Sequence, residues 1–227
     1  MNFIGRILAG IVCLAGLPIH LLLCLAIRLQ DGGPALYLCP RLGWNGKFYA
    51  MFKYRTMQVN CPPMIASGFM VLVSQADARV TRLGRWLRCG IDEFPQLWNI
   101  VRGEMNWVGP RPDPEWMLEN YGPVCRQRIA VLPGITGLAQ VMDSRYLSTA
   151  DGFAIDLWYI AHRSLWLDAW VVLVTPFFIA GWRSIGRRRL HALRNLPEFE
   201  QLLRQCTEEL AVAESRSQQN LVAKSRV

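Results

Sequence analysis

The sequence predicts an α+β protein, mainly helical and associated with a membrane, that carries one small β-hairpin and an apolar, proline-broken helix near its start. Three observations indicate this class. Residues 7–27 form an uncharged apolar run, Asn45-Gly46 separates two strand-like runs, and most later segments place apolar residues at helical spacing. The 227 residues suit one domain with appendages or two small ones. With 52% hydrophobic and 19% charged residues, the chain is too polar for a polytopic membrane protein.

The first element is the apolar run 7–27. As a straight helix it would reach about 31 Å, enough for a bilayer core. Pro18 lies in its middle, and a proline inside a helix removes a hydrogen bond and bends the helix. Arg6 and Arg28 flank the run and do not select an orientation. From this segment alone a spanning helix, a re-entrant helix and a cleaved signal peptide all remain open.

A β-hairpin and a basic helix are predicted next. Asn-Gly between strand-like runs is a strong hairpin signal, and here it joins Leu38–Trp44 to Phe48–Tyr54. Residues 58–76 are predicted to be mostly loop. Residues 79–90 predict a helix with one apolar face, and its opposite face carries Arg79, Arg82, Arg85 and Arg88.

Residues 92–103 have the pattern of a short helix. Asp92 stands at the N-cap position, Pro95 lies in the first turn and Gly103 provides the stop. Leu97, Ile100 and Val101 form the predicted apolar face.

The rest of the chain is predicted to be largely helical. Residues 112–132 predict a helix broken near Gly122-Pro123, and 133–141 a loop that enters a strand-like run. Residues 148–163 predict an amphipathic helix. Residues 164–194 predict an apolar segment bent at Pro176, which is either a core helix or a membrane-surface helix. Residues 197–227 predict a polar helix that frays.

Charge and cysteine usage narrow the chemistry. The net charge is +8 and almost all of the basic residues are arginine, which suits phosphate-bearing partners such as nucleotides, nucleic acids or phospholipid head groups. Seven cysteines are scattered without a CxxC pair or a Cys/His cluster, so a structural metal site of that kind is not expected. Nucleic-acid binding is not expected either, because no basic patch is interleaved with aromatic residues.

The adjacent acids Asp92 and Glu93, called here the acid pair, allow two interpretations. Asp92 alone is most simply a helix cap, worth about 1 kcal/mol. A second carboxylate, the preceding basic helix and Arg111 in a stiff Pro-Arg-Pro turn favour phosphate chemistry instead. Carboxylates hold Mg²⁺, and arginine neutralises negative charge.

Several stretches together give a family resemblance. The chain resembles the bacterial sugar transferases of the monotopic phosphoglycosyl transferase family, which start undecaprenyl-linked glycan assembly. The matching stretches stand in family order: GGPALYLCPRLGWNGKFYAMFKYRTM, DARVTRLGRWLR, IDEFPQLWNIVRGEMNWVGPRP, PGITGLAQV and DLWYIAHRSLWLDAWVVLVT. They extend over about residues 1 to 180, and several motifs in fixed order are far more specific than a lone Asp-Glu.

The resemblance implies a reaction. A phosphosugar would pass from a UDP-sugar to undecaprenyl phosphate through a covalent aspartyl intermediate, with release of UMP. Asp92 would be the nucleophile, and Glu93 with Asp92 would hold Mg²⁺. The remaining implied site residues contact phosphates, nucleotide or sugar: Lys53, Arg55, Arg88, Pro110, Arg111, Pro112, Arg128 and Gln140.

The resemblance also implies an organisation. Family members carry a proline-broken re-entrant helix, so residues 1–30 are expected to enter and leave the cytosolic face of the bacterial inner membrane. Residues 31–195 would be the catalytic domain and residues 196–227 a polar tail. The expected partners are the UDP-sugar, undecaprenyl phosphate and membrane lipid. A homodimer is one expectation, because family members often dimerise.

One departure from the family pattern lies beside the acid pair. The connection LRCGIDE is one residue shorter than usual, so Arg88 stands one residue closer to Asp92. The competing interpretation of the whole chain is a non-catalytic, membrane-peripheral scaffold of a polysaccharide assembly system.

Overall fold

The computed structural model describes residues 3–61, 77–142, 147–182 and 184–224. The chain forms two compact units. The first comprises Met1–Pro40 and Ala50–Met105, and the second comprises Arg41–Tyr49 and Asn106–Val227. Each unit is described by itself. This division differs from the three functional segments expected from the resemblance, which stay a prediction.

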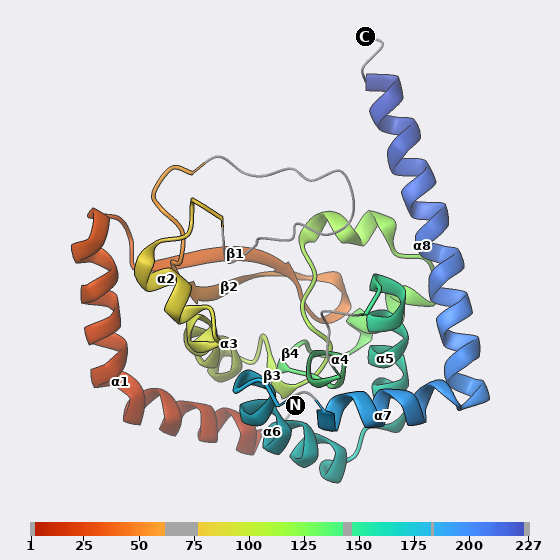
Figure 1. Ribbon diagram of the computed structural model, residues 1–227, viewed down its shortest axis with the longest axis horizontal. Coiled ribbons are helices and arrows are strands. Elements are labelled where there is room, and N and C mark those ends of the chain that lie inside the picture. Colours follow the sequence, from red (N-terminus) through yellow and green to blue (C-terminus); the bar gives the residue numbers. More distant parts are fainter. Residues whose placement is uncertain (1–2, 62–76, 143–146, 183, 225–227) are drawn as a thin grey trace. The chain divides into compact units, whose positions relative to one another are not determined.

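The first unit begins with α1, Phe3–Asp31, which contains Pro18. Figure 1 shows α1 bent into two arms rather than straight. Most of its large apolar side chains are exposed, and only Gly5, Ala9 and Ile27 are buried. Within the described residues it is the one helix long and apolar enough to cross a membrane. An apolar helix that leaves most of its apolar surface uncovered is suited to lipid rather than to a protein core.

A close helix packing joins α1 to the segment that carries the acid pair. This segment consists of the 3₁₀ helix η2, Ile91–Gln96, and the α-helix α3, Leu97–Arg102. The Arg6 Nε atom of α1 donates to the Val101 carbonyl at 2.8 Å. Gly16 lies so close to Phe94 that a Cβ atom there would stand 2.4 Å from the ring Cζ atom. The segment that carries the acid pair therefore packs directly against α1.

The predicted hairpin is confirmed. Strands β1, Leu36–Leu42, and β2, Phe48–Tyr54, form a two-stranded sheet closed by η1, Trp44–Gly46. Asn45 and Gly46 have φ angles of 54° and 75°, the left-handed conformation that an Asn-Gly hairpin turn requires.

A small core fixes the hairpin to its neighbours. Ile27 of α1, Ala35, Tyr54 of β2 and Leu87 are buried together, and Phe94 packs against them. The end of α1, strand β2 and the acid-pair segment therefore share one core.

The basic helix is shorter than predicted. Helix α2, Arg82–Leu87, begins after Thr81, whose side chain accepts a hydrogen bond from the Gly84 N–H. The predicted separation of an apolar and a basic face is seen here, because Val80 and Leu87 are buried while Arg82 and Arg85 are exposed.

The interpretation of Asp92 as an N-cap is wrong. The 3₁₀ helix η2 starts one residue earlier, at Ile91, and its cap position is Gly90 with a φ of 119°. Asp92 thus lies inside the first turn. The stop at Gly103 is confirmed, since its N–H donates to the carbonyls of Asn99 and Ile100.

The second unit contains a sheet that the sequence pattern did not reveal. Strands β3, Asn106–Val108, and β4, Gly134–Thr136, pair in parallel, with Asn106 opposite Gly134 and Val108 opposite Thr136. The predicted loop and strand-like run over residues 133–141 contains the strand β4, and its second half forms the short helix α4, Leu138–Val141. Leu138 and Val141 are both buried, which is a helical spacing of three.

The segment 112–132 breaks where expected but forms tighter helices. The 3₁₀ helices η3, Glu115–Asn120, and η4, Cys125–Ala130, stand on either side of the Gly122-Pro123 break. The predicted break at Gly122-Pro123 is confirmed, and the helices on either side of it are of the 3₁₀ type. A proline and glycine between short stretches leave too few residues for a stable α-helix.

Four longer helices complete the second unit. They are α5, Thr149–His162, α6, Leu165–Ile179, α7, Ser184–Arg194, and α8, Pro197–Lys224. Ser148 and Asp151 form a capping box that starts α5. Helix α8 packs along α5 (Figure 1). Pro176 lies inside α6, and the exposed apolar residues of this region include Trp166, Leu173 and Trp182.

We expect Gly84→Ala to destabilise the protein by about 1–3 kcal/mol. A Cβ atom at this position would stand 2.1 Å from the Thr56 carbonyl oxygen, so α2 would have to move away from the segment that follows β2. Thermal unfolding in detergent, followed by circular dichroism, measures the effect.

Gly152→Ala in α5 is the matched control. No atom lies within 4 Å of a Cβ placed there, so the substitution should stabilise the helix by up to about 1 kcal/mol. Equal unfolding midpoints for the two variants would contradict the close packing of α2.

Candidate active site

The acid pair lies in the first turn of η2, after a tight reversal of the chain. Helix α2 ends at Leu87, and Gly90 takes the left-handed conformation that turns the chain into η2. The Glu93 N–H donates to the Gly90 carbonyl at 3.3 Å. The shortened connection noted in the sequence is thus closed by a glycine turn, and Asp92 and Glu93 are both half-buried.

Lys53 and Glu93 are brought together, although they lie 40 residues apart. The Lys53 Nζ atom on β2 is 2.8 Å from the Glu93 Oε1 atom. The two side chains are 17% and 19% exposed, so the pair is half-shielded and still open to solvent. An ammonium group beside the acid pair suits a site that receives phosphate oxygens.

Asn99 holds β2 in place, and sequence reasoning missed it. Its side-chain oxygen accepts from the Phe52 N–H at 3.1 Å, and its Nδ2 atom donates to the Ala50 carbonyl at 2.8 Å and to Glu104 at 2.7 Å. Asn99 is fully buried. An asparagine in an otherwise apolar helix face was the available signal. The Asn99 side-chain amide bonds the backbone of β2 as a neighbouring strand would. It thereby fixes the position of β2, and so of Lys53, relative to α3.

Arg55 has a structural set of partners. Its guanidinium forms two hydrogen bonds of 2.5 Å with the Asp31 carboxylate and one of 2.6 Å with the Pro34 carbonyl. These bonds lower the pKa of the Asp31 carboxyl. Asp31 ends α1, so this ion pair ties the membrane helix to β2. The bonds of Arg55 within the protein are extensive, and its contact with substrate stays a prediction.

Arg88 lies at the C-cap of α2, four residues before Asp92 in the sequence. Its Nε atom donates to the Thr56 hydroxyl at 3.1 Å, and the side chain is half-buried at the end of α2. The first unit thus holds five of the predicted site residues, which are Lys53, Arg55, Arg88, Asp92 and Glu93.

The second unit holds the other five. The Pro-Arg-Pro turn directly follows β3, and Pro110 and Pro112 are buried while Arg111 is exposed. The Gly134 N–H donates to the Pro110 carbonyl at 3.0 Å, which fixes the turn to β4. Gln140 on α4 donates to the Ile135 carbonyl at 3.4 Å. The two stiff prolines therefore present Arg111 on the surface.

Arg128 is buried and holds this turn in place through hydrogen bonds. It donates to the Asp156 carboxylate at 2.7 and 3.0 Å, to Asp113, and to the Arg111 carbonyl at 3.2 Å. Its guanidinium also lies 3.8 Å from the Phe153 ring centroid. Burial raises the pKa of the Asp156 carboxyl to about 6, and the Arg128 guanidinium opposes this shift. Arg128 is 5% exposed, so the structure gives it internal partners.

The acid pair offers two carboxylates that could bind a metal ion. Among the described residues no group of three or more His, Cys, Asp or Glu side chains is arranged to hold a metal ion. Mg²⁺ needs fewer protein ligands, because it keeps several waters and is bound by one or two carboxylates plus substrate phosphates. The two adjacent carboxylates of the acid pair fit that requirement.

Comparison with known proteins decides the family. Residues 2–181 match the family described as bacterial sugar transferase, a stretch that includes every predicted site residue. The chain belongs to the bacterial sugar transferase family. The resemblance drawn from the sequence motifs is confirmed.

Characterised members of this family give the nearest context. The chain is 40% identical over 181 residues to the undecaprenyl-phosphate glucose phosphotransferase of Komagataeibacter xylinus, covering 73% of this chain and 33% of that protein. It is 35% identical over 179 residues to the exopolysaccharide production protein ExoY of Rhizobium meliloti, covering 74% and 79%. It is 40% identical over 168 residues to the UDP-glucose:undecaprenyl-phosphate glucose-1-phosphate transferase of Caulobacter vibrioides, covering 70% and 61%.

Several sugar transferase relatives are much longer than the matched region. The chain spans between 33% and 38% of the length of five curated relatives that it matches, including the K. xylinus protein.

We expect Arg128→Ala to destabilise the protein by about 3–5 kcal/mol, because it leaves the buried Asp156 carboxylate without its partner. The midpoint of thermal unfolding in detergent measures the loss.

Arg126→Ala is the control for this substitution. Arg126 is an exposed neighbour in η4, so its loss should change stability by no more than about 0.5 kcal/mol. If both variants unfold at the wild-type midpoint, Arg128 does not hold the turn.

Proposed function

We propose that this bacterial sugar transferase moves a phosphosugar from a UDP-sugar to undecaprenyl phosphate. The observation that carries the proposal is the position of the acid pair, in a partly open turn that packs against an apolar membrane helix. A lipid-linked acceptor presents its phosphate at the membrane surface, so an acid pair beside α1 is suited to receive it. The names of relatives, which include undecaprenyl-phosphate phosphotransferases, support the same donor and acceptor.

The reaction takes place in two displacements at one phosphorus atom. An oxygen of the Asp92 carboxylate attacks the β-phosphorus of the UDP-sugar, and the bond from that phosphorus to the bridging oxygen breaks, which releases UMP. The phosphosugar is then held on Asp92 as an acyl phosphate. An oxygen of undecaprenyl phosphate attacks the same phosphorus and frees the carboxylate. The products are UMP and undecaprenyl-diphospho-sugar, and no proton or external co-reactant is needed.

The surrounding charges make the first attack feasible. A carboxylate and a diphosphate repel each other, so positive charge must lie between them. Lys53 stands 2.8 Å from Glu93 and reaches the region where the diphosphate would bind. Arg88, at the C-cap of α2, is a second cation of the same unit. The phosphate contact of Arg111 stays a prediction. Arg55 and Arg128 act by holding α1 and the turn in place.

Mg²⁺ is part of the proposal. Glu93 together with Asp92 would hold the ion, and the bound ion would supply charge neutralisation on the diphosphate.

The sugar itself is left open. Relatives are named for glucose, galactose and N-acetylgalactosamine, so a panel of UDP-sugars is the appropriate test.

Membrane placement forms the second part of the proposal. We infer that α1 enters and leaves the same, cytosolic, face of the inner membrane. Its bent shape, with Pro18 inside the helix, supports this topology (Figure 1). In the second unit, the exposed tryptophans Trp166 on α6 and Trp182 after it are of the kind found at membrane–water interfaces.

We expect Asp92→Asn to abolish both UMP release and labelling of the protein by a radioactive phosphosugar, because an amide cannot act as the nucleophile. Arg88→Ala should only weaken both. The assay incubates membranes containing the full chain with Mg²⁺, undecaprenyl phosphate and each UDP-sugar in turn.

Two results of this assay would count against the proposal. Wild-type turnover by Asp92→Asn would show that Asp92 is not the nucleophile. Absence of UMP from the wild-type protein with every sugar would favour the non-catalytic scaffold.

For the topology, we expect a cysteine at Phe3 to remain unlabelled by a membrane-impermeant maleimide added to intact cells. Leu38→Cys should behave in the same way, and both should react once the cells are permeabilised. Labelling of Phe3→Cys alone in intact cells would show a spanning helix.

A further inference from the structure

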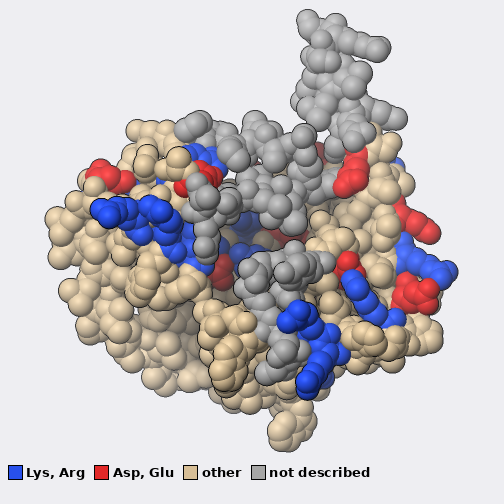
Figure 2. All heavy atoms as spheres, in the orientation of Figure 1, with Lys and Arg blue, Asp and Glu red and all other residues tan. Residues whose placement is uncertain are grey.

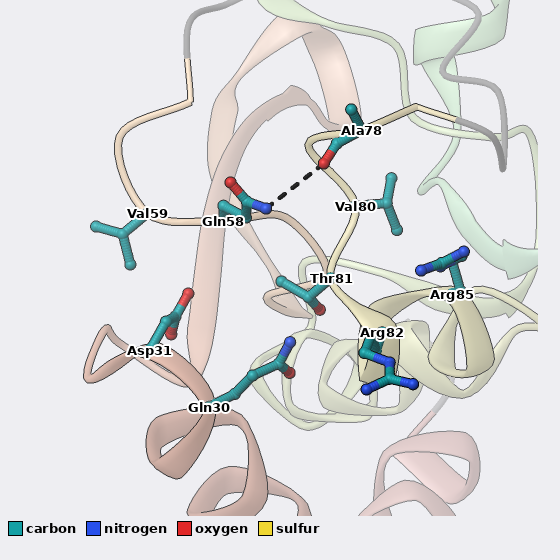
Figure 3. A pocket seen from close by; sticks show the side chains of 9 residues that line it. All are labelled: Gln30, Asp31, Gln58, Val59, Ala78, Val80, Thr81, Arg82 and Arg85. Atoms are coloured by element: carbon teal, nitrogen blue, oxygen red, sulfur yellow. Dashed lines mark hydrogen bonds between the residues drawn. The ribbon is translucent and has the colours of Figure 1, made fainter.

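A pocket of about 470 Å³ lies in the first unit, formed by residues outside the predicted site. Figure 3 shows its walls: Gln30 and Asp31 at the end of α1, Gln58 and Thr81 on the chain between β2 and α2, and the helix α2 itself. The volume is within the range of ordinary small-ligand pockets. Its lining is mainly polar, with no role in the proposed reaction.

Two arginines give the pocket its charge. Arg82 and Arg85 line it from α2, both are exposed, and neither forms an ion pair with an acid in the described part of the chain. The single acid on the wall, Asp31, is neutralised by its two 2.5 Å hydrogen bonds to Arg55. Figure 2 shows a group of basic side chains on the left of the visible face, over the position of α2 in Figure 1. The pocket therefore has a net positive charge and suits a phosphate group.

The exposed apolar residues around the pocket indicate which class of phosphate-bearing ligand it suits. Leu25 and Leu29 of α1 are 55% and 77% exposed, and they lead directly to the wall residues Gln30 and Asp31. Trp86, between Arg85 and Leu87 on α2, is 58% exposed. Exposed tryptophan and arginine at the end of an apolar helix are typical of the membrane–water interface. A ligand in this pocket would have its polar part beside the arginines and its apolar part beside α1.

We propose that this pocket binds the head group of an anionic membrane phospholipid. Arg82 and Arg85 hold the phosphodiester, Gln30 and Gln58 offer hydrogen bonds to the alcohol beyond it, and the acyl chains lie along α1. The inference does not depend on the sugar transferase reaction. The pocket is a lipid site that anchors the end of α1 at a defined depth.

The test measures binding of dioctanoyl phosphatidylglycerol to the full-length protein in detergent by native mass spectrometry. We expect the double variant Arg82→Gln/Arg85→Gln to bind it about 30-fold more weakly than the wild type, since each basic residue near an anionic lipid contributes about fivefold. Arg126→Gln/Arg204→Gln removes the same charge from exposed positions of the second unit and should bind within twofold of the wild type.

A second variant separates loss of lipid binding from loss of folding. Gln30 is exposed, so Gln30→Glu should leave the unfolding midpoint unchanged while its added negative charge weakens binding several-fold. Dioctanoyl phosphatidylcholine should bind the wild type at least tenfold more weakly than the glycerol lipid.

Three outcomes would overturn the assignment. If Arg82→Gln/Arg85→Gln or Gln30→Glu binds phosphatidylglycerol with wild-type affinity, the pocket is not the lipid-binding site. Equal loss in the control Arg126→Gln/Arg204→Gln would show a general charge effect. Binding of UDP or of a short-chain polyprenyl phosphate that depends on Arg82 and Arg85, without binding of phosphatidylglycerol, would assign the pocket to the reaction. Lipid binding should persist in Asp92→Asn, so failure of the proposed reaction and failure of the lipid site are separable.

Discussion

The contact between the membrane helix and the acid-pair segment is the constraint on which the first unit depends. Gly16 allows Phe94 to lie against α1, and Arg6 bonds the Val101 carbonyl further along the same interface. Because Phe94 follows Glu93 directly, this contact fixes the acid pair relative to α1. The hairpin joins through the shared core of Ile27, Tyr54 and Leu87. A soluble scaffold could achieve the same geometry only by covering α1, which this protein leaves exposed.

Arginine–carboxylate pairs serve as internal ties in both units. Arg55 fastens the end of α1 to β2 through Asp31, and Arg128 fastens the Pro-Arg-Pro turn through Asp113 and Asp156. The guanidinium group suits this task because it forms several directed hydrogen bonds at once and keeps its charge when buried. The arginines of this chain thus divide into two kinds. Some hold the chain together, and others, such as Arg111, are presented to solvent.

Local signals were readable from the sequence, and distant pairings were not. Asn45-Gly46 fixes a hairpin by backbone conformation alone, and Gly103 ends a helix in the same way, so both were predictable. The prediction of Asp92 as a cap is wrong because Ile91 packs against a core built from residues far along the chain, which the local pattern does not show. The parallel strands β3 and β4 are three residues each, too short for an alternating pattern. Arg55 and Arg128 were recognised as functional arginines, but their carboxylate partners, Asp31 and Asp156, carry no sequence mark.

The Lys53–Glu93 ion pair has a consequence for how ligands would enter the site. The carboxylate of Glu93 and the ammonium of Lys53 lie 2.8 Å apart, so each compensates the charge of the other. A metal ion bound at Glu93 would release Lys53, and a diphosphate bound at Lys53 would release Glu93. Each ligand therefore makes the partner group available to the other, and by thermodynamic linkage the affinities of the two must rise together. An ion pair of this kind would therefore couple the binding of the metal ion to the binding of the diphosphate.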